Sequence, residues 1–186
     1  MGYIYLYTGS GGGKTTNALG LALRSIGHNH KVIVIQFLKF WKNTGEYKVM
    51  KKLKPYYEIH QFGRPGWFKL DGKKPAVYKF GGKAFTVKSL EELDKKLATE
   101  ALAFAKKSLE RKPHLLVLDE INLALHWKLL DINKVLELLN NIPERTDLVL
   151  TGRHAPKKLL AKADFVNVIT DRKHPEKIPL TKGVQY

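Results

Sequence analysis

Short runs of consecutive apolar residues alternate along the chain with longer segments whose apolar residues recur at helical spacing. Continuous apolar runs are typical of strands that helices cover on both faces. We assign such strands to residues 3–8, 32–37, 114–120, 147–153 and 164–170. The periodic segments predict helices at 15–27, 89–112, 131–141 and 156–163. Strands that alternate with helices predict an α/β fold: an open, mainly parallel sheet with right-handed crossovers and helices on both faces.

The predicted helices carry signals for their ends and for the face that enters the core. Ser89 followed by Glu92 has the pattern of a capping box, and Asp131 is suited to cap the next helix. The face of helix 15–27 that we expect in the core carries Ala18, Leu19, Ala22, Leu23 and Ile26.

Residues 38–88 show no regular alternation. One possible strand, `PYYEIHQF`, precedes a stretch rich in Gly, Pro, Lys and aromatic residues. Long irregular segments inside a compact domain are usually functional or mobile, and we expect mobility at 62–88. Because the chain shows no repeat, low-complexity tract or linker, we expect residues 1–186 to form a single domain.

Composition narrows the choice of partners. Lys and Arg number 33 against 17 Asp and Glu, a formal net charge of +16, which suits either a polyanion partner or a solvated lysine-rich surface. Most of these cations are Lys, whereas nucleic-acid readers favour Arg, so we favour the surface and do not expect nucleic acid as a partner. The chain has no Cys, no apolar stretch long enough for a membrane and no signal segment, so we expect a cytoplasmic protein without membrane contact.

The segment `TGSGGGKTT` joins the first strand to the first helix and has the features of a phosphate-binding loop. Its glycines let backbone N–H groups approach phosphate at a helix N-terminus, Lys14 supplies a mobile positive charge, and Thr15 supplies a hydroxyl for Mg²⁺. The standard pattern G-x-x-x-x-G-K-[ST] would place its first glycine at position 8, where this chain has Thr8. We therefore predict an ATP-binding P-loop NTPase fold of RecA-like type.

Two carboxylates end the predicted strand `LLVLDE`. The carboxyl ends of parallel strands meet at one sheet edge, where the glycine loop also lies. We predict that Asp119 is a ligand of Mg²⁺ or Mn²⁺ and that Glu120 lies behind it or orients water.

The loop, the acidic strand and the later motifs together resemble the ATP:corrinoid adenosyltransferases of the CobA/CobO/BtuR type. The resemblance spans essentially the whole chain, through `VIVIQFLKF`, `TGE`, `LDEINLAL`, `LTGRHAP`, `KADFVNVI`, `KHP` and `GVQY`. In that family the loop reads T-G-N-G-K-G-K-T-T, so Thr8 fits the family pattern. Ser10 replaces its Asn and Gly12 its first Lys, which leaves Lys14 as the loop's only cation. We expect looser triphosphate binding or help from a Lys elsewhere.

The resemblance implies that ATP lies reversed across the loop, with triphosphate as leaving group and the ribose C5′ open to attack by Co(I) of a corrinoid substrate. It implies a metal held by Thr15, Asp119 and Glu120, with Lys14 stabilising the leaving group. The residues it assigns to ATP are Thr8, Gly9, Ser10, Gly11, Gly12, Gly13, Lys14, Thr15, Thr16, Arg24 and Arg153.

The family also packs aromatic side chains beneath the corrin to remove the axial ligand of cobalt. The matching region here is `QFGRPGWFKL`, where Trp67 and Phe68 are candidates with Phe62 behind them. This resemblance makes 62–88 a substrate-covering segment. It also implies a homodimer and a reductase or flavoprotein that supplies electrons.

Two alternatives stay open at this point: a RecA-like ATPase that acts with nucleic acid, and a small-molecule kinase. Adenosyl transfer yields inorganic triphosphate and a cobalt–carbon bond, whereas both alternatives yield ADP.

Overall fold

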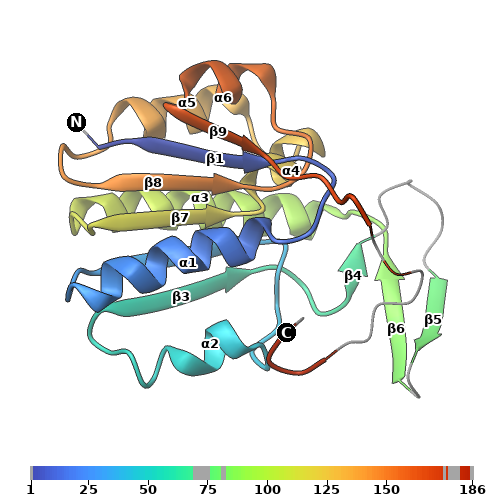
Figure 1. Ribbon diagram of the computed structural model, residues 1–186. Helices are drawn as coiled ribbons and strands as arrows, with labels where there is room; N and C mark the ends of the chain where they lie inside the picture. The colour runs from blue at the N-terminus through green and yellow to red at the C-terminus, as the bar shows by residue number, and fades with distance from the viewer. Residues whose placement is uncertain (1, 69–75, 81–82, 174, 176–180, 185–186) are drawn as a thin grey trace.

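The computed structural model describes residues 2–68, 76–80, 83–173, 175 and 181–184 (Figure 1). Six strands form one sheet in the order β3-β2-β7-β8-β1-β9, and every neighbouring pair is parallel. These strands are β1 (Ile4–Thr8), β2 (Val32–Phe37), β3 (Tyr57–Phe62), β7 (Leu115–Asp119), β8 (Asp147–Thr151) and β9 (Phe165–Val168). The all-parallel sheet confirms the predicted fold class.

Helices cover both faces of the sheet, and the residues of β2 point alternately to them. Val34 packs with Ala22 of α1 (Lys14–Gly27), on the face where α2 (Gly45–Val49) also lies. Ile35 packs on the opposite face with Ala101 of α3 (Glu92–Glu110). That second face also receives α4 (Ile121–His126), α5 (Ile132–Asn140) and α6 (Lys157–Lys162). Apolar residues on both sides explain why the strands read as continuous apolar runs.

Two expectations about helices were wrong. Leu23 was assigned to the core, but it is 64% exposed, because Ala18, Ala22 and Ile26 define the buried face and Leu23 lies to its side. The capping box at α3 uses Glu91 and Asp94 instead of Ser89 and Glu92: the Asp94 carboxylate accepts the Glu91 N–H at 2.9 Å. The expected cap of α5 is confirmed, since Asp131 accepts the N–H of Asn133 at 2.8 Å.

The segment 38–88 is more regular than its composition suggested. After α2 and β3 it contains a second sheet in the order β4-β6-β5, built from β4 (Trp67–Phe68), β5 (Ala76–Phe80) and β6 (Lys83–Lys88). This small sheet lies beyond the carboxyl ends of the large sheet's strands (Figure 1). Among the described residues, no helix is both long and apolar enough to cross a membrane.

The parallel arrangement brings four connections to one edge of the large sheet. The loops that follow β1, β2, β7 and β8 all leave from the carboxyl ends of adjacent or nearby strands. Residues that are more than a hundred positions apart in sequence therefore become neighbours at this edge, as the contact between Thr15 and Asp119 shows.

Candidate active site

The glycine loop runs from β1 into α1 with its backbone wrapped around the Lys14 side chain. The buried Lys14 ammonium donates to the carbonyl of Gly9 at 3.0 Å and to that of Gly11. Gly9 has φ +101°, and a Cβ there would overlap the backbone of Ile169 after β9. Only glycine fits at position 9, because the loop here lies against the residue that follows β9, the neighbour of β1 in the sheet.

Two N–H groups of the loop bind the segment after β9: the Gly11 N–H donates to the Ile169 carbonyl at 2.9 Å, and the Gly12 N–H donates to an acidic side chain. The Gly12 N–H donates to Asp171 Oδ1 at 3.1 Å, as it could to a phosphate oxygen. A Cβ at Gly12 would meet open space, so a side chain such as the family's Lys could begin there without a clash. Ser10 and Thr16 are exposed on either side of this stretch.

Thr8 has a structural partner at the site. Its hydroxyl oxygen accepts the N–H of Ala155 at 3.3 Å, and the residue is 9% exposed. The contact joins the end of β1 to the connection that follows β8. A glycine at position 8 would lack this bond, which gives a physical reason for the departure from the standard pattern.

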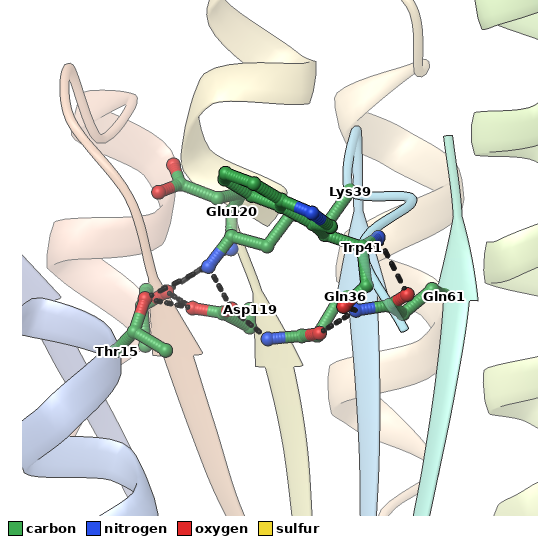
Figure 2. Close-up of polar contacts among 8 residues, drawn as sticks. Thr15, Gln36, Lys39, Trp41, Gln61, Asp119 and Glu120 are labelled. Atoms are coloured by element: carbon green, nitrogen blue, oxygen red, sulfur yellow. Dashed lines mark hydrogen bonds and ion pairs between the residues drawn. The ribbon is translucent and has the colours of Figure 1, made fainter. Parts of the chain in front are cut away.

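Asp119, fully buried at the end of β7, is the centre of a polar network from four elements (Figure 2). Its Oδ1 accepts from Thr15 Oγ1 of α1 at 2.8 Å and from Thr151 Oγ1 of β8 at 2.6 Å. Its Oδ2 accepts from Gln36 Nε2 of β2 at 3.0 Å and from Lys39 Nζ at 2.6 Å. The carboxylate is thereby fixed in orientation.

The charges at Asp119 explain its ionisation. Burial alone would raise the pKa of this carboxyl, but the Lys39 ammonium and the Thr151 and Thr15 hydroxyls hold it below its ordinary value. Burial alone would lower the pKa of Lys39, and the Asp119 carboxylate raises it instead. Both groups are therefore charged at neutral pH.

Glu120 follows in a left-handed backbone conformation, with φ 66°, and its N–H donates to Thr151 Oγ1 at 3.0 Å. The buried Oε2 has no hydrogen-bond partner. Burial and the neighbouring Asp119 charge raise the pKa of Glu120, while Lys39, Lys14 and Arg153 lower it to a smaller extent. An unsatisfied carboxylate oxygen in strained backbone is typical of a functional site.

The donor set fits a divalent metal of the magnesium type. Thr15 Oγ1 and Asp119 Oδ1 lie 2.8 Å apart, both are hard oxygen donors, and Glu120 offers a further oxygen without a partner. The described residues contain no cluster of three or more His, Cys, Asp or Glu side chains able to hold a metal alone. Mg²⁺ usually keeps few protein ligands and takes the others from phosphates and water.

The remaining predicted residues lie in different parts of the structure. Arg153 follows β8 at the site edge, close enough that its charge, after burial, contributes to lowering the pKa of Lys14. Arg24 is exposed in the last turn of α1, roughly 15 Å from Lys14 by the helical rise, so the structure does not bring it to the loop. Trp67 and Phe68 form β4, and their side chains lie outside the described part. Phe62 packs on Phe104 of α3, with ring centroids 5.6 Å apart.

Sequence reasoning missed three partners of Asp119: Gln36, Lys39 and Thr151. Each lies within two residues of the end of a predicted strand, which is a signal that could have identified them. Asn122 was missed as well; its amide donates to the Gly152 carbonyl at 3.0 Å and joins α4 to the connection after β8.

The fold and this edge define a P-loop-type nucleotide-binding protein. Sequence comparison then places the chain more narrowly: a model of the ATP:corrinoid adenosyltransferase BtuR/CobO/CobP family matches residues 1–186, and the chain belongs to this family. Its activity, adenosyl transfer from ATP to a corrinoid, is favoured over a nucleic-acid ATPase or a kinase.

Three relatives with similar sequences carry names that agree with this family. A corrinoid adenosyltransferase of Sinorhizobium sp. is 31% identical over 190 residues, covering 100% of this chain and 80% of the relative. One from Pseudomonas aeruginosa is 29% identical over 187 residues, with 100% and 84% covered. The corrinoid adenosyltransferase CobA of Salmonella typhimurium is 28% identical over 175 residues, with 93% and 79% covered.

Proposed function

We propose that the chain transfers the 5′-deoxyadenosyl group of ATP to the Co(I) centre of a reduced corrinoid, cobalamin or a cobinamide-type precursor, and releases triphosphate. The observation that carries the proposal is the bond between Thr15 of the glycine loop and Asp119, in a chain that matches the family over its full length. In the reaction cobalt supplies an electron pair to C5′, the C5′–O bond breaks, and its electrons leave with triphosphate.

The chain's own groups would stabilise that leaving group. Loop N–H groups would bind triphosphate oxygens, as Gly12 N–H now binds Asp171. Lys14 would exchange the Gly9 and Gly11 carbonyls for phosphate oxygens, and Arg153 would add charge from the neighbouring connection. Thr15 and Asp119, with Glu120 beside them, would hold Mg²⁺ or Mn²⁺, which when bound neutralises charge that develops on triphosphate.

The small sheet would cover the corrinoid. It lies beyond the edge that carries the loop and Asp119, and it includes Trp67 and Phe68 in β4 (Figure 1). We assign one of these two aromatic residues to displacement of the axial ligand of cobalt. Its flat apolar ring would exclude water and other ligands from that face of the metal.

One incubation tests the reaction. Protein is mixed with MgATP, a corrinoid and a strong reductant, and the product is read from its light-sensitive adenosylcorrinoid spectrum and from chromatography of the nucleotide. We expect adenosylcorrinoid and triphosphate in equal amounts; ADP without the cobalt–carbon product would refute the proposal. Trp67→Ala should impair this activity, whereas a kinase or an ATPase would be indifferent to that change.

We further propose a cytoplasmic homodimer that receives electrons from a reductase or flavoprotein. The edge strand β9 supports self-association, because Phe165, Val166 and Val168 are 45%, 44% and 65% exposed. Light scattering at micromolar concentration checks the dimer, and a monomer at all concentrations would exclude it.

A further inference from the structure

Lys39 binds two of the residues that we assign to the metal, Asp119 and Thr15. Its ammonium lies 2.6 Å from Asp119 Oδ2 and 3.1 Å from Thr15 Oγ1 (Figure 2). The side chain is 30% exposed, so it can leave this position without unpacking the core. Asp119, by contrast, is fully buried. A tethered cation thus occupies the place where a metal would contact the same two residues.

The backbone around Lys39 holds this side chain over the site. Leu38 adopts φ 62°, a left-handed conformation that a non-glycine residue rarely takes, and its N–H donates to the Phe62 carbonyl at 2.8 Å. A Cβ on Gly63 would overlap the Leu38 carbonyl carbon and the Lys39 nitrogen. Strain of this kind persists where the surrounding structure fixes it, and it gathers at functional sites.

A hydrogen-bond chain ties the next residues to the same carboxylate. Asp119 accepts from Gln36, whose amide oxygen accepts from Gln61 Nε2 at 2.8 Å. Gln61 Oε1 in turn accepts the Trp41 N–H at 2.8 Å. The segment that carries Lys39 is therefore anchored on both sides, by Leu38 and by Trp41.

An ammonium and a divalent metal cannot bind Asp119 together without strong repulsion, because both would be a few ångströms apart in a poorly screened site. Metal binding requires Lys39 to withdraw. Triphosphate bound on the adjoining loop would then be a strong anion for Lys39, because position 12 of this loop has no positive side chain. Lys39 would supply the charge that this loop lacks.

We propose that Lys39 is a positioning residue that holds Asp119 before the nucleotide binds, yields this carboxylate to the metal as metal–ATP enters, and then binds triphosphate. The proposal rests on the proposed use of ATP with a divalent metal. If Lys39 and Asp119 formed only a structural ion pair, Lys39 would stay on Asp119 when metal–ATP binds and would not move to triphosphate.

Mn²⁺ binding to the protein without nucleotide tests the exchange directly. Free Mn²⁺ is titrated by its electron paramagnetic resonance signal with wild type, Lys39→Met, Lys39→Gln and the control Lys42→Met. Lys42 is an exposed neighbour whose ammonium lies 5.8 Å from the Phe40 ring centroid. If Lys39 occupies the carboxylate in most molecules, its loss should tighten Mn²⁺ binding about tenfold, while Lys42→Met should match wild type.

Calorimetry with inorganic triphosphate in the presence of Mn²⁺ gives the second half of the test. Both Lys39 variants should bind triphosphate severalfold more weakly than wild type and Lys42→Met, although they bind Mn²⁺ alone more tightly. Unchanged Mn²⁺ affinity in both variants, or triphosphate affinity equal to wild type, would overturn the proposal. Circular dichroism confirms that the variants fold.

Neither readout depends on adenosyl transfer. If wild type made no adenosylcorrinoid, the proposed function would fail, whereas opposite changes in Mn²⁺ and triphosphate affinity would still establish the exchange at Lys39.

Discussion

At the scale of single residues, Asp119 concentrates the most interactions at the site. Its two oxygens accept four hydrogen bonds, from Thr15, Thr151, Gln36 and Lys39. The site needs a carboxylate for its two acceptor oxygens as well as for its charge, since an amide at position 119 could not accept from all four donors.

We predict that Asp119→Asn abolishes adenosyl transfer and lowers the free energy of unfolding by about 3 kcal/mol, because it leaves the Lys39 ammonium without its counter-ion. Activity assays and urea unfolding measure the two effects. Lys42→Met serves as the matched control and should change neither. A variant of unchanged stability would show that the Lys39–Asp119 pair contributes nothing net.

Glu120 should make the free energy of unfolding decrease as pH rises. Burial and Asp119 raise its pKa in the folded state, so its contribution to stability is fully present below the ordinary glutamate pKa and is lost as pH rises through the raised value. Glu120→Gln removes this loss. We expect the variant to gain stability relative to wild type as pH is raised from about 4 to 8, measured by urea unfolding across that range. A constant difference at every pH would contradict the raised pKa.

At the scale of secondary-structure elements, Arg64 joins the two ends of the small sheet. Its guanidinium donates to Asp94 Oδ1 at 2.8 Å and Oδ2 at 2.6 Å, to Glu91 Oε2 at 2.6 Å and to the Ser89 carbonyl at 3.1 Å. Arg64 precedes β4 and its partners follow β6, so these contacts connect the start and the end of the segment that contains the small sheet. Asp94 is fully buried and also caps α3.

Arg64→Met should lower the free energy of unfolding by about 3 kcal/mol, since it leaves the buried Asp94 carboxylate without its cation. Because Arg64 ties down the segment that contains Trp67 and Phe68, which we propose to cover the corrinoid, KM for the corrinoid should rise while KM for ATP changes little. Lys106→Met is the control: its pair with Glu137 is exposed, and its loss should cost below about 0.5 kcal/mol. Equal rises in both KM values would argue against a specific effect on corrinoid.

At the scale of the whole molecule, the net charge of +16 sets how anions approach. A strongly positive protein attracts ATP from a distance, and salt screens that attraction over a Debye length of about 10 Å at 0.1 M. We expect KM for ATP to rise severalfold between about 0.05 and 0.5 M NaCl, with kcat at saturating ATP unchanged. Steady-state kinetics in a salt series measure both values, and a flat KM would show that the surface charge has no part in substrate capture.

Features that depend on a local pattern of residues were predicted well from the sequence. Continuous apolar runs located β1, β2, β7, β8 and β9, and the order strand, glycine loop, Lys14 and Thr15 located the loop, because both signals lie within a few consecutive residues. The position of Asp119 followed from one rule, that parallel strands end at the same edge. Within 38–88 the sequence did not predict β5 and β6, because their composition carries no clear strand pattern and their pairing with each other defines them.

Only the tertiary structure decided which side chains meet at that edge. The contacts of Lys39, Gln36 and Thr151 with Asp119 join β2 and the turn after it to β7 and β8, which lie far away in sequence, so no local periodicity records them. The burial that leaves Glu120 Oε2 without a partner and the strained turn at Leu38 arise in the same way. Local pattern determined the elements and the loop; packing between distant strands determined the charges around them.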